Sequence, residues 1–235
     1  MNPNAPARVQ GLAGTTFTTR SHGYGDTPVS AIIKLKEWDR AALLLNLGIS
    51  IPTGSIDEMD FTPLPAASVK VLPYPMQLGS GTFDLLPGLT YIWQHEKFSG
   101  GAQAKGTIRL GENDQDYTLG DRFSSTAWVS WLATKSLSTS ARIEWQAWGD
   151  IDGADSRIGT NAPFAPNPPT VPTAQTNLRD GQRIDVHWGI NWVTEKGPGR
   201  NQRLAAEIGI PVYQNLDGPQ LETDLLLTLG WQMAF

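Results

Sequence analysis

Asp185 and His187 are the residues whose types and spacing suggest chemistry most directly. They lie two positions apart in an alternating stretch, so both side chains would point to the same face of a strand, and Glu207 lies in a later stretch of the same kind. A histidine beside a carboxylate can act as a general acid or base. No serine nucleophile is recognisable with them, and His22 and His95 are distant in sequence. We therefore predict that the chain is not an enzyme, with a hydrolase as the alternative.

Two short segments are rich in side-chain oxygens and raise the question of a metal site. Residues 112–116 contain Glu, Asn and two Asp, and residues 150–155 contain three Asp and a Gly. Ca²⁺ takes six to eight oxygen ligands, but neither segment matches the spacing of an EF-hand loop. Solvated polar loops are the simpler interpretation. The sequence predicts no resident metal ion and no cofactor.

Strands must position these residues, because polar and apolar side chains alternate along much of the chain. The clearest case is Glu222–Phe235, in which one parity is mainly apolar and the other is polar except for Leu226. Successive side chains of a strand point to opposite faces, so such a segment has one apolar and one polar face. Ten stretches are predicted as strands: 15–21, 30–38, 45–51, 83–94, 102–110, 122–133, 142–147, 183–192, 203–210 and 222–235.

The connections between these stretches alternate between short and long. Tight turns are expected at 38–40, 95–97 and 134–137, with a somewhat longer one at 194–201. The links in the other set are 53–81, 111–117, 150–180 and 214–221, and two of them are long and rich in Pro and Gly. A transmembrane β-barrel has short periplasmic turns on one rim and longer extracellular loops on the other.

Composition narrows the classes of protein further. The chain has 235 residues, a mean hydropathy of −0.27 and no run of eighteen apolar residues, so it does not resemble a helical membrane protein. It has no cysteine, which excludes disulfides and thiolate metal sites. A net charge of −5 gives no support to nucleic-acid binding. Nine Trp residues are many for this length, and the aromatic girdles of a membrane barrel would account for them.

We therefore expect an all-β antiparallel transmembrane β-barrel of about ten strands, with twelve in a full-length relative as the alternative count. Residues 1–235 are expected to form one domain, without the signal peptide and further upstream residues that such proteins carry. An even number of strands would place both termini on the same side. Trp231, Met233 and Phe235, in a final strand that ends on an aromatic residue, are expected to be the signal for the barrel-assembly machinery. A soluble β-sandwich with a Trp-rich core is the rival fold.

The polar parity of the strands would face a narrow lumen filled with charged side chains of mixed sign. Isolated charges are costly in such a space, so pairing is expected. The predicted lumen or selectivity residues are Lys34, Lys105, Arg109, Arg142, Glu144, Arg183, Asp185, His187, Arg203, Glu207, Glu222 and Asp224. The same parity adds Arg20, Lys36, Asp84 and Arg122. Basic groups outnumber acidic ones, which favours anionic solutes.

Several segments that contain Gly or Pro carry a resemblance to a known family. They are Gly25-Asp26-Thr27, 48–55, 74–82, 87–91, Gly120-Asp121, 211–214, 218–220 and Gly230-Trp231-Gln232. Together they resemble a family of outer-membrane transporters related to the "MetA pathway of phenol degradation" proteins, over roughly residues 14–235. The resemblance implies an outer-membrane β-barrel assigned to transport, in a family whose members often accompany copper-handling or aromatic-degradation functions. It implies no catalytic residues, and the Met- and His-rich part of such proteins is absent from this chain, which argues against copper handling.

The segment 74–82 is the most specific part of the resemblance and precedes a strand within a long loop. We expect it to form a constriction at the barrel mouth, through Tyr74, Met76, Gln77 and Ser80, with tight-turn geometry alone as the simpler interpretation. The predicted function is a pore or facilitator for small solutes in the bacterial outer membrane. The alternatives are an outer-membrane hydrolase and a closed structural barrel. Expected partners are the lipid bilayer and lipopolysaccharide, the barrel-assembly machinery, a small solute and, as a further option, a larger envelope complex, but no nucleic acid.

Overall fold

The computed structural model describes residues 18–62, 68–158, 172–194 and 202–233. These residues form an antiparallel all-β structure with thirteen strands and two short 3₁₀ helices. None of the helices among them is long and apolar enough to cross a membrane. Nine strands build the main sheet: β1 (Thr27–Trp38), β2 (Ala41–Ile51), β5 (Phe83–His95), β6 (Phe98–Leu110), β8 (Arg122–Leu132), β9 (Leu137–Trp148), β11 (Gly181–Thr194), β12 (Gln202–Leu216) and β13 (Leu226–Met233).

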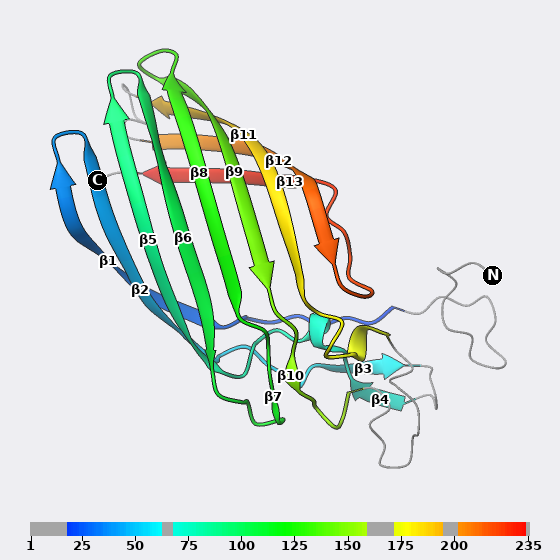
Figure 1. Ribbon diagram of the computed structural model, residues 1–235. Coiled ribbons are helices and arrows are strands. Elements are labelled where there is room, and N and C mark those ends of the chain that lie inside the picture. Colours follow the sequence, from blue (N-terminus) through cyan, green and yellow to red (C-terminus); the bar gives the residue numbers. More distant parts are fainter. Residues whose placement is uncertain (1–17, 63–67, 159–171, 195–201, 234–235) are drawn as a thin grey trace.

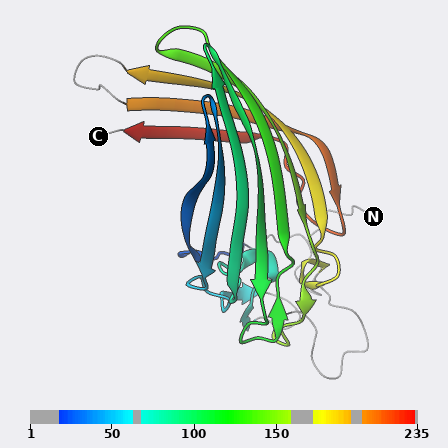
Figure 2. The same cartoon turned by 60° about the vertical axis from the view of Figure 1, so that its left-hand side comes forward.

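The main sheet is a strongly curved trough whose strands follow one another in chain order from β1 to β13 (Figures 1 and 2). Nine of the ten strands predicted from sequence are therefore confirmed. The tenth, 15–21, is not: residues 18–21 form no strand, and 15–17 lie outside the described residues. The described residues before β1 instead run across the end of the sheet (Figure 1), where the backbone N–H of Arg20 donates to Asp60.

Short and long connections separate onto two rims, as the alternation of their lengths predicted. The turns β1–β2, β5–β6 and β8–β9 lie on one edge of the trough, which we call the turn rim (Figure 1). The connections 52–82, 111–121, 149–180 and 217–225 run from the opposite edge, the loop rim. The β11–β12 connection, 195–201, lies outside the described residues.

The sheet is open between its edge strands, β1 and β13. Because each strand is antiparallel to its neighbour, the first and the ninth strands run in the same direction. Nine strands also place the start of β1 on the loop rim and the end of β13 on the turn rim, so the expectation of an even strand number with both ends on one side is not met by this sheet. Closure into a cylinder is not present in the described residues.

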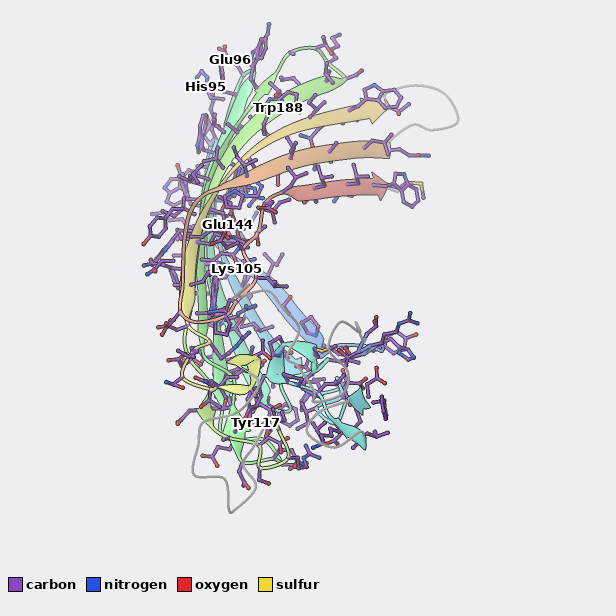
Figure 3. All side chains as sticks on the ribbon, turned by 90° about the vertical axis from the view of Figure 1, so that its right-hand side faces the viewer. His95, Glu96, Lys105, Tyr117, Glu144 and Trp188 are labelled. Atoms are coloured by element: carbon purple, nitrogen blue, oxygen red, sulfur yellow. The ribbon has the colours of Figure 1, made fainter. Side chains whose placement is uncertain are left out.

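The two faces of the sheet differ sharply in polarity. Strand pairing places Ile143, Trp188 and Leu227 on the convex face, where their side chains are 50%, 54% and 70% exposed. The same pairing places Lys105 and Glu144 on the concave face, where Figure 3 shows them inside the trough. In a water-soluble sheet the apolar parity would be packed against another layer. Here no second layer of the described residues covers it.

A β-bulge in β1 changes the predicted direction of one charged side chain. The pairing with β2 shifts between Lys34 and Lys36, so Lys34 keeps the concave parity while Lys36 is opposite Leu43 on the convex side. Lys36 Nζ lies 5.1 Å from the centre of the Trp38 ring, a cation–π contact at the turn rim. The inward orientation predicted for Lys36 is therefore wrong, because a one-residue shift in register reverses the face. Glu37 takes the concave parity instead and pairs with Lys34.

The apolar core of the described residues lies in the long loops and not under the sheet. Tyr74, Tyr117, Ile151, Ile158 and Ala174 form one buried cluster. They come from three different loop-rim connections that carry the hairpin β3 (Met59–Thr62) and β4 (Ser68–Val71), η1 (Tyr74–Met76), β7 (Tyr117–Thr118) with β10 (Asp152–Gly153), and η2 (Pro172–Ala174). We call this unit the loop cap. Figure 3 shows it at the loop rim, on the concave side of the sheet.

Truncating one isoleucine in the loop cap and one in the sheet should show whether the cap is packed as a unit of its own. Ile158 is 1% exposed in the cap core, so Ile158→Ala should destabilise the cap by about 2–5 kcal/mol and speed proteolysis of the long loops. Ile143→Ala removes the same atoms from a side chain that is 50% exposed on the convex face, and it should leave loop proteolysis unchanged. Limited proteolysis of the folded protein measures both. Equal rates for the two variants would show that the cap is not a packed unit.

Candidate functional site

An arginine on the concave face links two neighbouring glutamates across three strands. Arg142 on β9 donates through Nη1 to Glu144 Oε2 at 2.5 Å, and through Nε and Nη2 to Glu207 on β12 at 3.1 and 2.5 Å. The strand between them, β11, places His187 opposite Arg142 and Gly189 opposite Glu207. A guanidinium that is shared by two carboxylates is satisfied on both of its edges. The predicted charge pairing in the lumen set is confirmed here.

His187 lies against this network and is almost fully buried. Its Nδ1 is 3.3 Å from Glu207 Oε1 and its Nε2 is 3.9 Å from Glu144 Oε2. The imidazole covers Gly209 of β12, where a Cβ atom would lie 2.3 Å from Nδ1. A side chain at that position would expel the ring. The described residues bring no serine hydroxyl into hydrogen-bond contact with Nε2, so the partners of this histidine are acidic groups only.

Through Arg183, the buried Asp185 on the concave face is linked to the segment that precedes β13. It is 0% exposed and accepts a hydrogen bond from Arg183 Nε at 2.9 Å. Arg183 Nη1 also donates to Thr223 Oγ1 at 2.7 Å, and the side-chain amide of Gln214 bonds both backbone groups of Thr223. The predicted lumen residues Glu222 and Asp224 are exposed on either side of this anchor, because β13 begins only at Leu226.

A second polar chain runs from the sheet to the loop rim. Arg109 on β6 forms an ion pair with the buried Asp84 on β5. Asp84 Oδ1 accepts from Thr82 Oγ1 at 2.8 Å, and Ser80 Oγ donates to the carbonyl of Thr82 at 3.2 Å. These bonds connect a buried ion pair of the trough to the segment that enters β5. Two of the predicted lumen residues are therefore held by the loop that precedes the strand.

Asp26 is the point at which three separate segments of the chain meet. Its carboxylate accepts hydrogen bonds from the backbone N–H of Gly54 at 3.0 Å and from the N–H and hydroxyl of Ser80 at 2.8 and 2.7 Å. Gly54 and Gly79 touch through their backbones: a Cβ on Gly79 would lie 2.3 Å from the carbonyl oxygen of Gly54. The sequence analysis singled out all three segments but did not predict that they meet.

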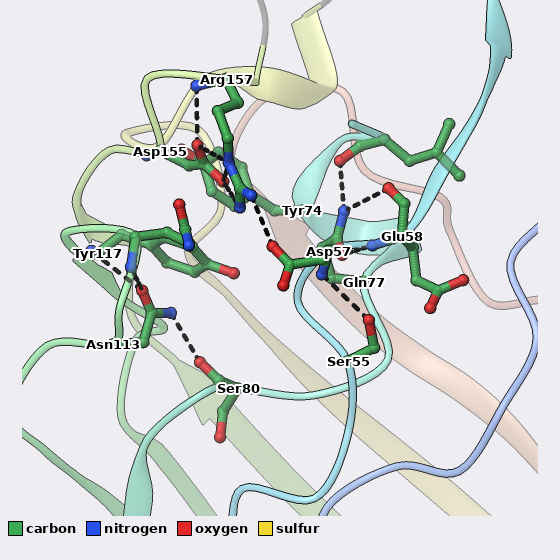
Figure 4. Close-up of polar contacts among 12 residues, drawn as sticks. Ser55, Asp57, Glu58, Tyr74, Gln77, Ser80, Asn113, Tyr117, Asp155 and Arg157 are labelled. Atoms are coloured by element: carbon green, nitrogen blue, oxygen red, sulfur yellow. Dashed lines mark hydrogen bonds and ion pairs between the residues drawn. The ribbon is translucent and has the colours of Figure 1, made fainter. Parts of the chain in front are cut away.

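The predicted constriction residues hold the loop cap together (Figure 4). The Gln77 amide donates to the carbonyls of Leu72 at 2.7 Å and Glu58 at 3.3 Å, and it accepts from the Glu58 N–H at 2.9 Å. Ser80 and Tyr74 are buried, and Met76 Sδ accepts from Thr19 at 3.5 Å. These polar groups bond the protein itself.

An ion pair that sequence reasoning missed fastens two of the long loops. Arg157 binds the buried carboxylate of Asp155 through Nε and Nη2, at 2.8 Å for the shorter contact, and reaches Asp57 through Nη1 at 2.6 Å. The hydrogen bonds to Asp155 and then to Asp57 raise the pKa of Arg157. The Asp155 N–H also donates to Tyr74 Oη at 3.0 Å. The oxygen-rich stretch 150–155 thus supplies a partner for arginine.

The remaining predicted residues have varied surroundings. Arg203 contacts Asn191 and Gln232, which are neutral, and Lys34 pairs with Glu37. Lys105 has no ion pair with any of the described residues. Trp231 and Met233 lie exposed on the convex face of β13, and Phe235 lies outside the described residues. No cluster of three or more metal-ligating side chains occurs in the described part of the chain.

Alkaline pH should loosen the loop cap through Tyr117. Burial raises the pKa of this phenol to about 12, and the Asn113 side chain offsets part of that rise. The folded state therefore holds the proton more tightly than the unfolded state. The stabilisation, about 2–3 kcal/mol, is complete below pH ~10 and is lost as pH rises through about 12. Tyr117→Phe keeps the buried ring and removes only the ionisable hydroxyl, so the variant should fold and lose this part of the alkaline transition. Tyrosinate absorbance and loop proteolysis against pH measure the difference.

No protein-family model matches this chain, and no curated protein is significantly similar to it. The functional interpretation therefore depends on the geometry of the sheet and its concave face.

Proposed function

We propose that this protein is a β-barrel pore or facilitator for small solutes in the bacterial outer membrane. The observation that carries the proposal is the convex face, where large apolar side chains are exposed on all nine strands of the main sheet. Water would make such a surface an aggregation site. In a membrane the same surface would contact lipid and would not aggregate. Because lipid offers no hydrogen bonds, every backbone group of a membrane-spanning sheet must then be paired, as in a closed barrel.

The positions of aromatic side chains on the convex face support the proposal that this face meets lipid. Phe83 and Tyr91 on β5 lie eight residues apart, as do Phe123 and Trp131 on β8. Eight residues of strand extend about 27 Å, or about 21 Å along the membrane normal at a tilt of ~40°. That distance fits the apolar band between the two aromatic girdles of an outer-membrane barrel. Trp192 extends the turn-rim band onto β11.

Closure of the barrel needs further strands. The free edges of β1 and β13 point in the same direction, so direct pairing between them would be parallel. Outer-membrane barrels of single bacterial chains are antiparallel with an even strand number. The nine-stranded sheet therefore requires an odd number of additional strands in the gap, which gives ten strands with one and twelve with three.

The concave face favours a water-filled lumen over a plugged one. Arg109, Arg142 and Arg183 form ion pairs there, and Lys105 and Arg122 line a cavity of about 450 Å³ on this face. A solute path through the trough would pass charged walls at the centre and the loop cap at the loop rim. The hydrolase alternative gains no support from His187, because its Nε2 has no hydrogen-bond partner among the described residues and its nearest polar contacts are Glu207 and Glu144.

Conductance is the direct test of the proposed function. The full protein, folded in detergent and added to a planar bilayer, should produce stepwise currents, and deletion within 53–81 should increase them because that loop contributes to the cap. Extraction by detergent alone and heat-modifiable gel migration should accompany the currents. Absence of current with intact membrane insertion would favour the closed structural barrel. A monomer that stays soluble without detergent would rule the proposal out.

Adjacent arginine substitutions should distinguish a lipid-facing convex surface from a water-facing one. Ala127 is exposed on the convex face near the centre of β8, and Thr126 is on the concave face beside Glu144. In lipid vesicles Ala127→Arg should reduce the free energy of unfolding by about 2–4 kcal/mol, whereas Thr126→Arg should cost much less. Chemical denaturation of vesicle-embedded protein measures both values. If Ala127→Arg is neutral, the convex face meets water.

A further inference from the structure

Two neighbouring cations of the concave face have no carboxylate partner among the described residues. Arg203 has none either, but the neutral Asn191 and Gln232 accept its hydrogen bonds. Arg109, Arg142 and Arg183 each bind a carboxylate, whereas Lys105 and Arg122 form no ion pair with any of the described residues. In a confined polar space, unneutralised cations of this kind attract anions.

The two cations are neighbours in the sheet. Lys105 on β6 pairs with Ser124 on β8, and Arg122 lies two residues before Ser124 on the same strand. Both side chains therefore point to the concave face as a diagonal pair, with Cα atoms about 7–8 Å apart. They line the same cavity, of about 450 Å³, which falls within the range of small-ligand sites.

The orientation of the guanidinium is fixed by an aromatic ring. Arg122 Cζ lies 5.7 Å from the centre of the Trp148 ring, and this ring covers Gly181, where a Cβ would lie 2.8 Å from Cζ2. An arginine stacked in this way keeps its N–H edge free for a planar, bidentate acceptor. Carboxylates and phosphates have that geometry, whereas chloride does not.

The rest of the wall adds neutral polar groups and one acid that is already occupied. Asn46 and Ser124 line the cavity, and Asn46 Oδ1 is buried without a hydrogen-bond partner in the described residues. Glu144 also reaches the wall, but Arg142 and the Gln146 amide bind its two oxygens. Its repulsion of an anion is therefore reduced.

We propose that Lys105 and Arg122 form a binding station for small oxyanions within the trough, which makes the pore select oxyanions over cations and over chloride. This inference rests on the proposed function for transport, but the binding itself does not require an open channel. The shared chemistry is a carboxylate or phosphate group, and the two are separate arms of the test.

The test combines binding with permeation in one set of variants. Lys105→Gln, Arg122→Gln and the double variant remove the station, and Lys105→Arg retains its charge. Lys36→Gln is the matched control, because it removes the same charge from the same sheet on the convex face. Thermal unfolding of the detergent-solubilised protein is measured in potassium acetate, phosphate and chloride at equal ionic strength. The same salts then provide reversal potentials in planar bilayers.

We expect acetate, phosphate or both to raise the unfolding temperature of the wild type and of Lys36→Gln relative to chloride, but not that of the double variant. The ratio of oxyanion to cation permeability should fall about threefold to tenfold in the double variant, and Lys105→Arg should restore it relative to Lys105→Gln. The acetate and phosphate arms tell which oxyanion is preferred. Equal responses of the wild type and the double variant to all three salts would overturn the station. Loss of all current with a preserved binding difference would overturn only the proposed transport.

Discussion

A sheet that exposes its apolar face depends on the solvent that this face meets. The described residues bury only six hydrophobic side chains, all in or next to the loop cap, while every strand of the main sheet has exposed large apolar side chains on its convex face. Burial at about 25 cal/mol per Å² is the main stabilising contribution in a soluble domain, and the sheet cannot obtain it from its own residues. In the proposed barrel, lipid replaces the missing layer. Ion pairs then fill the concave face, where a soluble protein would have its core.

The loop cap and the trough are one connected polar structure. Asp26 joins the segment before β1 to the two ends of the 52–82 connection, and Ser80 and Thr82 continue from it to the Asp84–Arg109 pair inside the trough. The positions of the loops and of the concave charges are therefore coupled through hydrogen bonds. In the proposed pore, this coupling holds the mouth in a fixed place relative to the charged wall.

Period-2 alternation sufficed to predict nine of the strands and the inward direction of most charged side chains, and the lengths of the connections predicted the two rims. It failed where local register or long-range contacts decide. The bulge that turns Lys36 outward has no signature in the sequence, and Glu222 and Asp224 continue an alternation that ends as structure at Leu226. The meeting of Gly54 and Gly79 at Asp26 was also missed, because contacts between distant segments leave no periodic trace. The one available signal in the sequence was that Gly54, Gly79 and Asp26 each lie in a Gly-containing segment.

The direction of the edge strands restricts what can fill the gap in the sheet. Two copies of this chain with the same orientation in a membrane would bring β1 of one against β13 of the other, and those strands run in the same direction. Such a dimer would be closed by parallel pairs, which the antiparallel pattern of outer-membrane barrels disfavours. An odd number of strands, entering at one rim and leaving at the other, satisfies both edges with antiparallel pairs. The exposed backbone of β1 and β13 is therefore suited to strands that complete one barrel around a single lumen.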